Sequence, residues 1–271
     1  MLAILCVHPP DGAVIQPNQR HIAERQPRQQ SVAVKADGIG LARMPGALAL
    51  VADPVLLAAG LGWAGIVVAW GWPVLHGSSS RFGSSLAIGV PAVLAPAAGV
   101  ATSDEPYLRF VPVALIIGLA IMFGHQILRR DGRPRLTESI GITSLGLAVI
   151  AIGPTWLPLA RDVRATEVAV VAFTAIAASS FADLAAGVAR IRPWMLPIAM
   201  LLGGVGAVIA SSLVGGPEVA PAALVGFVCA AVSHAVRRVH SVLPGISAIK
   251  GQLSSAAASL LVPGVVAYGL S

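Results

Sequence analysis

Apolar segments recur along most of the chain, and each is about as long as a membrane-crossing helix. An α-helix rises about 1.5 Å per residue, so about 20 residues cross the ~30 Å hydrocarbon layer of a bilayer. Runs that alternate apolar and polar residues, as a membrane β-barrel requires, do not occur. The pattern predicts an all-α, polytopic bundle of about eight transmembrane helices, at residues 55–75, 86–101, 111–128, 140–160, 167–188, 194–214, 219–236 and 252–270.

Two local features qualify this prediction. The segment at 86–101 is short and contains Pro91 and Pro96, so it either crosses the membrane as a kinked helix or re-enters it, which leaves seven or eight spans. Small residues one turn apart, at Gly203, Ala207 and Ser211, are the spacing that lets membrane helices approach closely. Their spacing is equally explained by the abundance of small residues in the chain.

The composition agrees with a membrane protein. The chain is 56% hydrophobic and 11% charged, whereas about a quarter of the residues in a soluble domain are charged. So little charge cannot cover a globule of this size, and the apolar surface must face lipid. Cys6 and Cys229 offer neither a disulfide framework nor a metal-binding spacing. We expect an integral protein of the plasma (inner) membrane whose main partner is the lipid bilayer.

The first 43 residues differ from the rest. They are polar, rich in Gln and contain five basic residues, with no sustained apolar period. We expect residues 1–43 to form a disordered tail and residues 44–271 to form the transmembrane domain. Met44 lies where the membrane-like sequence begins, and we expect it to be the natural start.

Basic residues cluster in short loops between the apolar segments, which is typical of cytoplasmic loops. The net charge of +6 therefore requires no nucleic-acid partner. The rule predicts that the loops at 129–139, 190–193 and 237–250 are cytoplasmic. With eight spans the N-terminus then lies outside, together with the five basic residues of the tail, and a start at Met44 removes this conflict.

A few ionisable or polar residues lie inside the predicted spans or at their ends. Asp183 is the clearest, because a charge at such depth costs several kcal/mol unless it is paired or hydrated. It either serves a site or is a hydrogen-bonded structural residue that joins two helices. We also predict that polar residues at the cytoplasmic ends could share one cavity with it, although each His could instead mark the membrane interface: His125, Gln126, Arg129, Arg130, Glu138, His234, Arg237 and Arg238.

Three segments of the C-terminal third carry a family resemblance. The run from Phe181 to Gly187 contains the embedded Asp183, the pair Arg237-Arg238 follows, and Leu243-Pro244-Gly245 precedes the last helix. This order resembles the phosphatidate cytidylyltransferase family, which joins CTP to phosphatidic acid with divalent metal at the cytoplasmic side. The resemblance implies that Asp183 meets metal or substrate and that Arg237 and Arg238 meet phosphate.

The chain departs from that family where the metal ligands would be. Ile246-Ser247 replaces the family's His-Gly-Gly, and Lys250-Gly251-Gln252 stands in place of acidic residues. Metal-assisted nucleotidyl transfer needs carboxylates to hold the cations, so we expect no cofactor, and Mg²⁺ only if the transferase-like alternative holds.

Three function classes remain open from the sequence. The first, which we favour, is a non-catalytic or degenerate membrane protein, for which other membrane proteins are candidate partners. The second is a small-solute transporter that uses Asp183 as a coupling or substrate residue. The third is transfer of a nucleotidyl group to a lipid, as the family resemblance implies.

Overall fold

A computed structural model of the chain describes residues 51–129, 135–185 and 190–271. The chain divides into two units, Met1–Ala42 and Arg43–Ser271, and the described residues all belong to the second. The predicted tail at 1–43 lies outside the described residues. Within the described ranges the secondary structure is helical and contains no strand, which confirms the predicted all-α class.

The described residues contain eight helical segments long and apolar enough to cross a membrane. Their number agrees with the predicted eight spans and supports a multi-pass membrane protein. The elements are α3 Pro54–Leu75, α4 Arg81–Ala101, α5 Val111–Leu128, α6 Leu136–Ile152, η1 Gly153–Trp156, η2 Pro158–Arg161, α7 Val163–Ser180, η3 Phe181–Ala185, η4 Arg192–Trp194, α8 Met195–Val214, α9 Val219–His240, α10 Ile249–Leu261 and α11 Gly264–Gly269.

Helix α4 covers the second predicted span, whose length in the sequence left open whether it crosses the membrane. It has 21 residues, with Pro91 and Pro96 inside it, and is long enough to cross the bilayer. The predicted span began at residue 86, whereas α4 begins at Arg81. The polar residues Arg81 and Ser84 delayed the predicted start, although Ser84 is buried between helices. Pro91 lies against Gly118 of α5, where a Cβ atom would come within 2.5 Å of the proline ring.

Local chemistry fixes several helix ends. The Asp53 carboxylate accepts hydrogen bonds from the backbone N–H groups of Val55 (2.8 Å) and Leu56 (3.2 Å), which caps α3 ahead of Pro54. Asp162 caps α7 in the same way. Helix α8 ends at Gly215, whose φ of +71° is a left-handed conformation that glycine adopts without steric cost.

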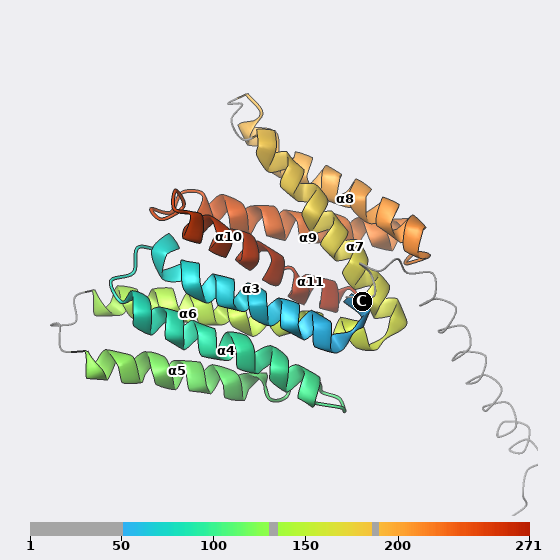
Figure 1. Cartoon of the computed structure of the whole chain (residues 1–271). Helices are drawn as coiled ribbons and strands as arrows, with labels where there is room; N and C mark the ends of the chain where they lie inside the picture. The colour runs from blue at the N-terminus through green and yellow to red at the C-terminus, as the bar shows by residue number, and fades with distance from the viewer. Residues whose placement is uncertain (1–50, 130–134, 186–189) are drawn as a thin grey trace, which may run out of the picture. The chain divides into compact units, whose positions relative to one another are not determined.

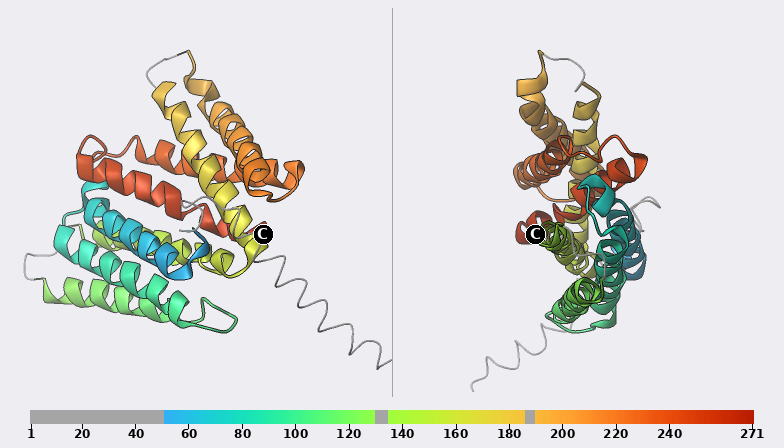
Figure 2. Two further views of the ribbon diagram at one scale, coloured as in Figure 1. Left: turned by 45° about the vertical axis from the view of Figure 1, so that its right-hand side comes forward. Right: turned by 90° about the vertical axis from the view of Figure 1, so that its left-hand side faces the viewer.

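The helices pack in two groups that meet at α10 (Figure 1). In the first group α3 lies between α4 and α10, and α4 also contacts α5 and α6. In the second group α7, α8 and α9 pack against one another, and α9 contacts α10. Figure 2 shows the α7–α8 hairpin crossing the other helices at a steep angle. Helix α10 thus lies beside α3 although the two are far apart in sequence.

Small residues form the contact between α8 and α9. A Cβ atom on Gly203 would lie 2.2 Å from the Cβ of Ala230, and one on Gly226 would lie 2.3 Å from the Cβ of Ala207. Ser211, one turn beyond Ala207, is also buried. The spacing at Gly203, Ala207 and Ser211 therefore marks a real helix crossing, with backbones as close as small side chains permit.

The first testable prediction concerns this crossing. Gly203→Ala should lower the free energy of unfolding by about 1–3 kcal/mol, because the added methyl group has no room. Gly124→Ala is the matched control, since a Cβ there meets nothing within 4 Å and alanine is the better helix former. Thermal unfolding of the two purified variants in detergent measures the difference. Equal midpoints for both would contradict the crossing.

Charged side chains divide unequally between the two ends of the helices. One end, named the basic end, has eight basic and two acidic residues among those described: Arg81, Arg129, Arg135, Arg190, Arg192, Arg237, Arg238, Lys250, Glu138 and Asp183. The opposite end has three basic and six acidic ones: Arg109, Arg161, Arg164, Asp53, Asp104, Glu105, Asp162, Glu167 and Glu218. The positive-inside rule predicts that the basic end is cytoplasmic.

Cysteine labelling tests this orientation. In a protein with Cys6 and Cys229 replaced by Ser, Glu218→Cys should react with a membrane-impermeant maleimide in intact cells. Ser241→Cys, in the loop at the basic end, should react only after lysis. Labelling of Ser241→Cys from outside would reverse the predicted orientation.

Candidate functional site

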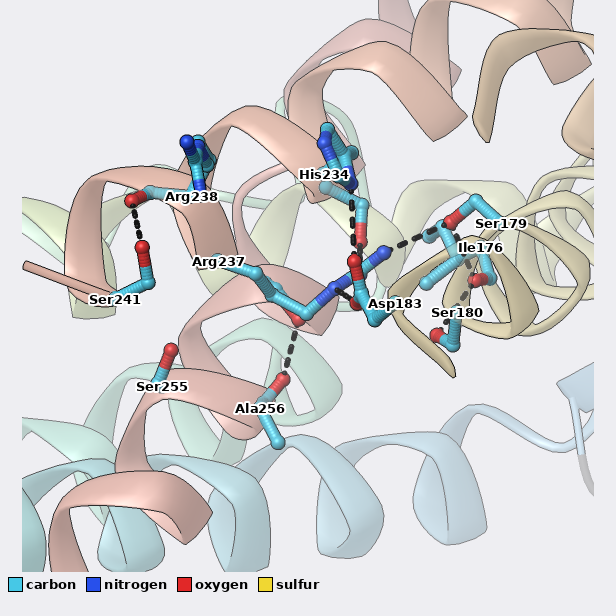
Figure 3. Close-up of polar contacts among 12 residues, drawn as sticks. Ile176, Ser179, Ser180, Asp183, His234, Arg237, Arg238, Ser241, Ser255 and Ala256 are labelled. Carbon is cyan, nitrogen blue, oxygen red and sulfur yellow. Dashed lines mark hydrogen bonds and ion pairs between the residues drawn. The ribbon is translucent and has the colours of Figure 1, made fainter. Parts of the chain in front are cut away.

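An ion pair between Asp183 and Arg237 joins the end of α7 to α9 at the basic end. Asp183 lies in η3, directly after α7, and its Oδ2 accepts a hydrogen bond of 2.6 Å from Arg237 Nε. The other two guanidinium nitrogens donate to Ser233 Oγ at 2.6 Å and to Ser179 Oγ at 3.2 Å. Figure 3 shows the Arg237 side chain beside Asp183 and Ser179. All three nitrogens of Arg237 are thus engaged within the protein.

His234 is a second basic neighbour of the same carboxylate. It lies one turn before Arg237 on α9 and therefore on the same helix face. Its Nδ1 is 3.2 Å from Asp183 Oδ1, although without the alignment of a hydrogen bond. The imidazole is 5% exposed, whereas the carboxylate is 36% exposed. Asp183 thus faces one permanent cation and one imidazole.

A cavity of about 260 Å³ opens beside this ion pair. We name it the basic pocket, and it is lined by Asp183, Arg192, Met195, His234, Arg237, Arg238, Ser241, Ile246, Gln252, Ser255 and Ala256. These residues come from η3, the α8 end, α9, the following loop and α10. Arg192 and Arg238 are exposed, and their guanidinium groups form no hydrogen bond or ion pair with another described residue. Two of the residues that line the basic pocket therefore carry guanidinium groups without a partner among the described residues.

The structure brings together only part of the predicted cavity. Asp183, His234, Arg237 and Arg238 line the basic pocket. His125, Gln126 and Glu138 do not, because α5 and α6 pack around α4 and not against α9. Glu138 instead lies 3.6 Å from Arg135 on the exposed surface. Arg129 belongs to the α4–α6 group as well, and Arg130 lies outside the described residues.

His125 and Gln126 belong to a separate polar cluster between α4, α5 and α6. His125 Nε2 lies 2.8 Å from Ser80 Oγ, and Gln126 Nε2 donates to Ser139 Oγ at 3.0 Å. Gln126 also accepts a hydrogen bond of 3.3 Å from Arg129. In the next turn Thr143 donates to Ser84 Oγ at 2.8 Å. Apart from the Gln126–Arg129 bond, which lies at the end of α5, these are contacts between helices of the kind that hold membrane helices together.

A third group of polar residues contains two histidines that the sequence did not single out. His76 caps α3, and its ring lies 4.3 Å from the ring of Trp72 and 5.9 Å from that of His240. His76 Nδ1 lies 3.1 Å from the Trp72 carbonyl oxygen; because a carbonyl only accepts, this nitrogen carries the proton. His240 Nδ1 lies 3.0 Å from Ser255 Oγ, so Ser255 connects this group to the basic pocket.

Burial lowers the pKa of His76, and the hydrogen bond to Trp72 offsets only part of that shift. The unfolded state therefore binds a proton more readily than the folded state below about pH 6.5. It follows that stability falls as the pH drops through this range.

The corresponding prediction is that the thermal midpoint of the wild type decreases between pH 8 and pH 5. His76→Asn should show a smaller decrease, because the amide can still donate to the Trp72 carbonyl and does not titrate. Differential scanning fluorimetry in detergent at both pH values measures this. An equal decrease in both proteins would assign the effect to other groups.

The sequence also missed Arg192, Ser241, Gln252 and Ser255 as pocket residues. Arg192 had a signal, since it stands in a basic loop, but the charge of that loop is fully accounted for by the positive-inside rule. The other three are uncharged residues on elements whose relative placement only the folded structure supplies.

Comparison of the chain with known protein families, with curated proteins and with solved structures gave no match. The function must therefore be argued from the basic pocket itself. Asp183 is the one carboxylate that lines this pocket among the described residues, and Arg237 already binds it. The described residues contain no group of three His, Cys, Asp or Glu side chains placed to hold a metal ion. The donor set does not fit the divalent metal that nucleotidyl transfer would use.

Proposed function

We propose that this membrane protein binds an anionic, phosphate-bearing ligand in the basic pocket and that Arg192 and Arg238 are its main contacts. The observation that carries the proposal is that Arg192 and Arg238 are among the residues that line the cavity, and that their guanidinium groups have no partner among the described residues. Guanidinium groups bind phosphate oxygens through paired, charge-assisted hydrogen bonds. The pocket also supplies hydroxyl and amide donors, from Ser241 and Gln252.

The surroundings of the basic pocket favour a ligand with an apolar part. Leu184 follows Asp183 and is 81% exposed, and Val242 follows Ser241 and is 80% exposed. Trp194, between Arg192 and Met195, is 64% exposed, and tryptophan is enriched at the level of the lipid head groups. These side chains would contact acyl chains while the arginines contact the phosphate. An anionic lipid of the cytoplasmic leaflet of the plasma membrane has this chemistry.

The resemblance to phosphatidate cytidylyltransferases supports the same pocket without supporting the reaction. Asp183 of the first segment and Arg237-Arg238 of the second line the cavity, and so does Ile246, the residue directly after the third segment. Asp183, which binds Arg237, is the one carboxylate of this set among the described residues. We therefore favour a degenerate relative that retains phosphate binding and performs no nucleotidyl transfer.

Transport is the weaker alternative. Secondary transporters place substrate and coupling ions near the middle of the bilayer, between broken helices. Asp183, His234 and Arg237 instead lie at the basic end, and α9 is a continuous helix of 22 residues. Binding of an anion at one membrane face agrees better with this placement.

Binding measurements on the purified protein in neutral detergent test the proposal. Arg192→Gln and Arg238→Gln should each weaken the binding of a short-chain phosphatidic acid about tenfold, because each removes a charge-assisted hydrogen bond. Arg135→Gln is the matched control, since Arg135 lies at the same end and pairs with Glu138 outside the pocket. Equal weakening by all three variants would indicate non-specific attraction.

Two further titrations distinguish a lipid phosphate from a soluble phosphate and test the alternative nucleotidyl-transfer reaction. Inorganic phosphate at the same concentration should bind more weakly than the lipid, and tighter binding of the free anion would favour a soluble ligand. CTP with Mg²⁺ should not bind, and saturable binding of CTP would favour the transferase. The absence of all binding would refute the proposed function.

A further inference from the structure

An acidic side chain in an anion-binding pocket requires an explanation. Asp183 is the only carboxylate among the described residues that line the basic pocket, and it is partly exposed. A negative charge there repels an anionic ligand unless a cation compensates it. The compensating cation is Arg237, at 2.6 Å.

Arg237 is held away from any ligand by its internal partners. Its Nε donates to Asp183, and its terminal nitrogens donate to Ser233 and Ser179. The side chain is 16% exposed, and a ligand could take it over only by displacing a charged hydrogen bond (Figure 3). Arg192 and Arg238 have no such partners among the described residues.

We propose that Asp183 is an intramolecular counter-ion that keeps Arg237 out of the anion site and so sets the charge that the basic pocket offers to its ligand. With the ion pair closed, the ligand meets two guanidinium charges, those of Arg192 and Arg238, and not three. Asp183 is then a specificity-determining residue that limits how strongly the pocket attracts anions. This inference rests on the proposed function, because it concerns the same pocket.

As a counter-ion, Asp183 should affect ligand binding in the opposite direction from a carboxylate that binds metal or substrate. A ligand-binding carboxylate would make Asp183→Asn abolish binding. A counter-ion predicts the opposite, because the amide removes a negative charge from the pocket and weakens the hold on Arg237. His234 does not reverse this expected effect, since an imidazole is neutral or positive, and it lies beside Oδ1 of the carboxylate, whereas Arg237 binds Oδ2.

The experiment is a double-mutant cycle on Asp183 and Arg237, with binding of inorganic phosphate at pH 8 measured by calorimetry in low salt. Asp183→Asn should bind phosphate about three- to tenfold more tightly than the wild type, because one repulsive charge is removed from a partly exposed site. Arg237→Gln should bind more weakly, because Asp183 is left uncompensated. The double variant should return to within about twofold of the wild type, because both charges of the pair are removed.

Thermal midpoints of all the variants show whether each is folded before binding is compared. If Arg237→Gln does not fold, Asp183→Asn and the double variant still test whether Asp183 is a counter-ion. Weaker binding by Asp183→Asn, or a double variant that binds much more weakly than the wild type, would overturn the counter-ion role and would assign Asp183 or Arg237 to the ligand. A wild type that binds neither phosphate nor lipid would instead refute the proposed function.

Discussion

The interior of a bilayer supplies no hydrogen-bonding partners, and the arrangement of polar groups in this protein depends on that constraint. Each buried polar side chain must find its partner on its own or a neighbouring helix. Ser254 of α10 donates to the Val68 carbonyl of α3 at 3.2 Å, and Trp72 of α3 donates to the Ile142 carbonyl of α6 at 2.8 Å. Such bonds tie α3, α6 and α10 together where lipid offers no substitute.

The same constraint explains the Asp183–Arg237 pair. A lone carboxylate at the end of a span would be costly, and a lone guanidinium equally so. Joined to each other and to Ser179 and Ser233, they connect η3 to α9 and leave no charge of either residue uncompensated. The sequence alternatives for Asp183, a site residue or a structural one, are therefore not exclusive, since the pair is structural and also borders the basic pocket.

Close approach of backbones is the second requirement of the fold. Where α3 meets α10, a Cβ atom on Gly71 would lie 2.0 Å from the Lys250 carbonyl oxygen, and one on Gly245 would lie 1.9 Å from that of Val74. No side chain larger than hydrogen fits at either position. This contact holds the loop before α10 against the end of α3, and that loop provides Ile246 to the basic pocket. The glycines thus position the pocket without touching a ligand.

The sequence predicted the spans well because their apolar length is a property of each segment alone. Its errors arose where a polar residue faces inward, as Ser84 does at the start of α4. The candidate site was predicted only in part, for a related reason. His234 and Arg237 share a helix face and could be grouped from their spacing, whereas the separation of His125 and Gln126 from them depends on which helices pack together. Arg192 was marked only by the charge of its loop, which the positive-inside rule already explained, and Ser255 had no local signal.

The charges of the basic pocket are compatible with the proposed phosphate binding in the absence of a metal ion. In metal-dependent phosphate chemistry, carboxylates collect cations, and the cations neutralise the phosphate. Here the neutralising charge is covalently part of the chain, on Arg192 and Arg238, and Asp183 is bound to Arg237. Guanidinium groups are charged at every physiological pH, so the pocket retains its positive charge without a bound ion. An arrangement of this kind is suited to holding a phosphate group, whereas its one carboxylate among the described residues is already bound to a guanidinium group and is not free to hold a metal ion.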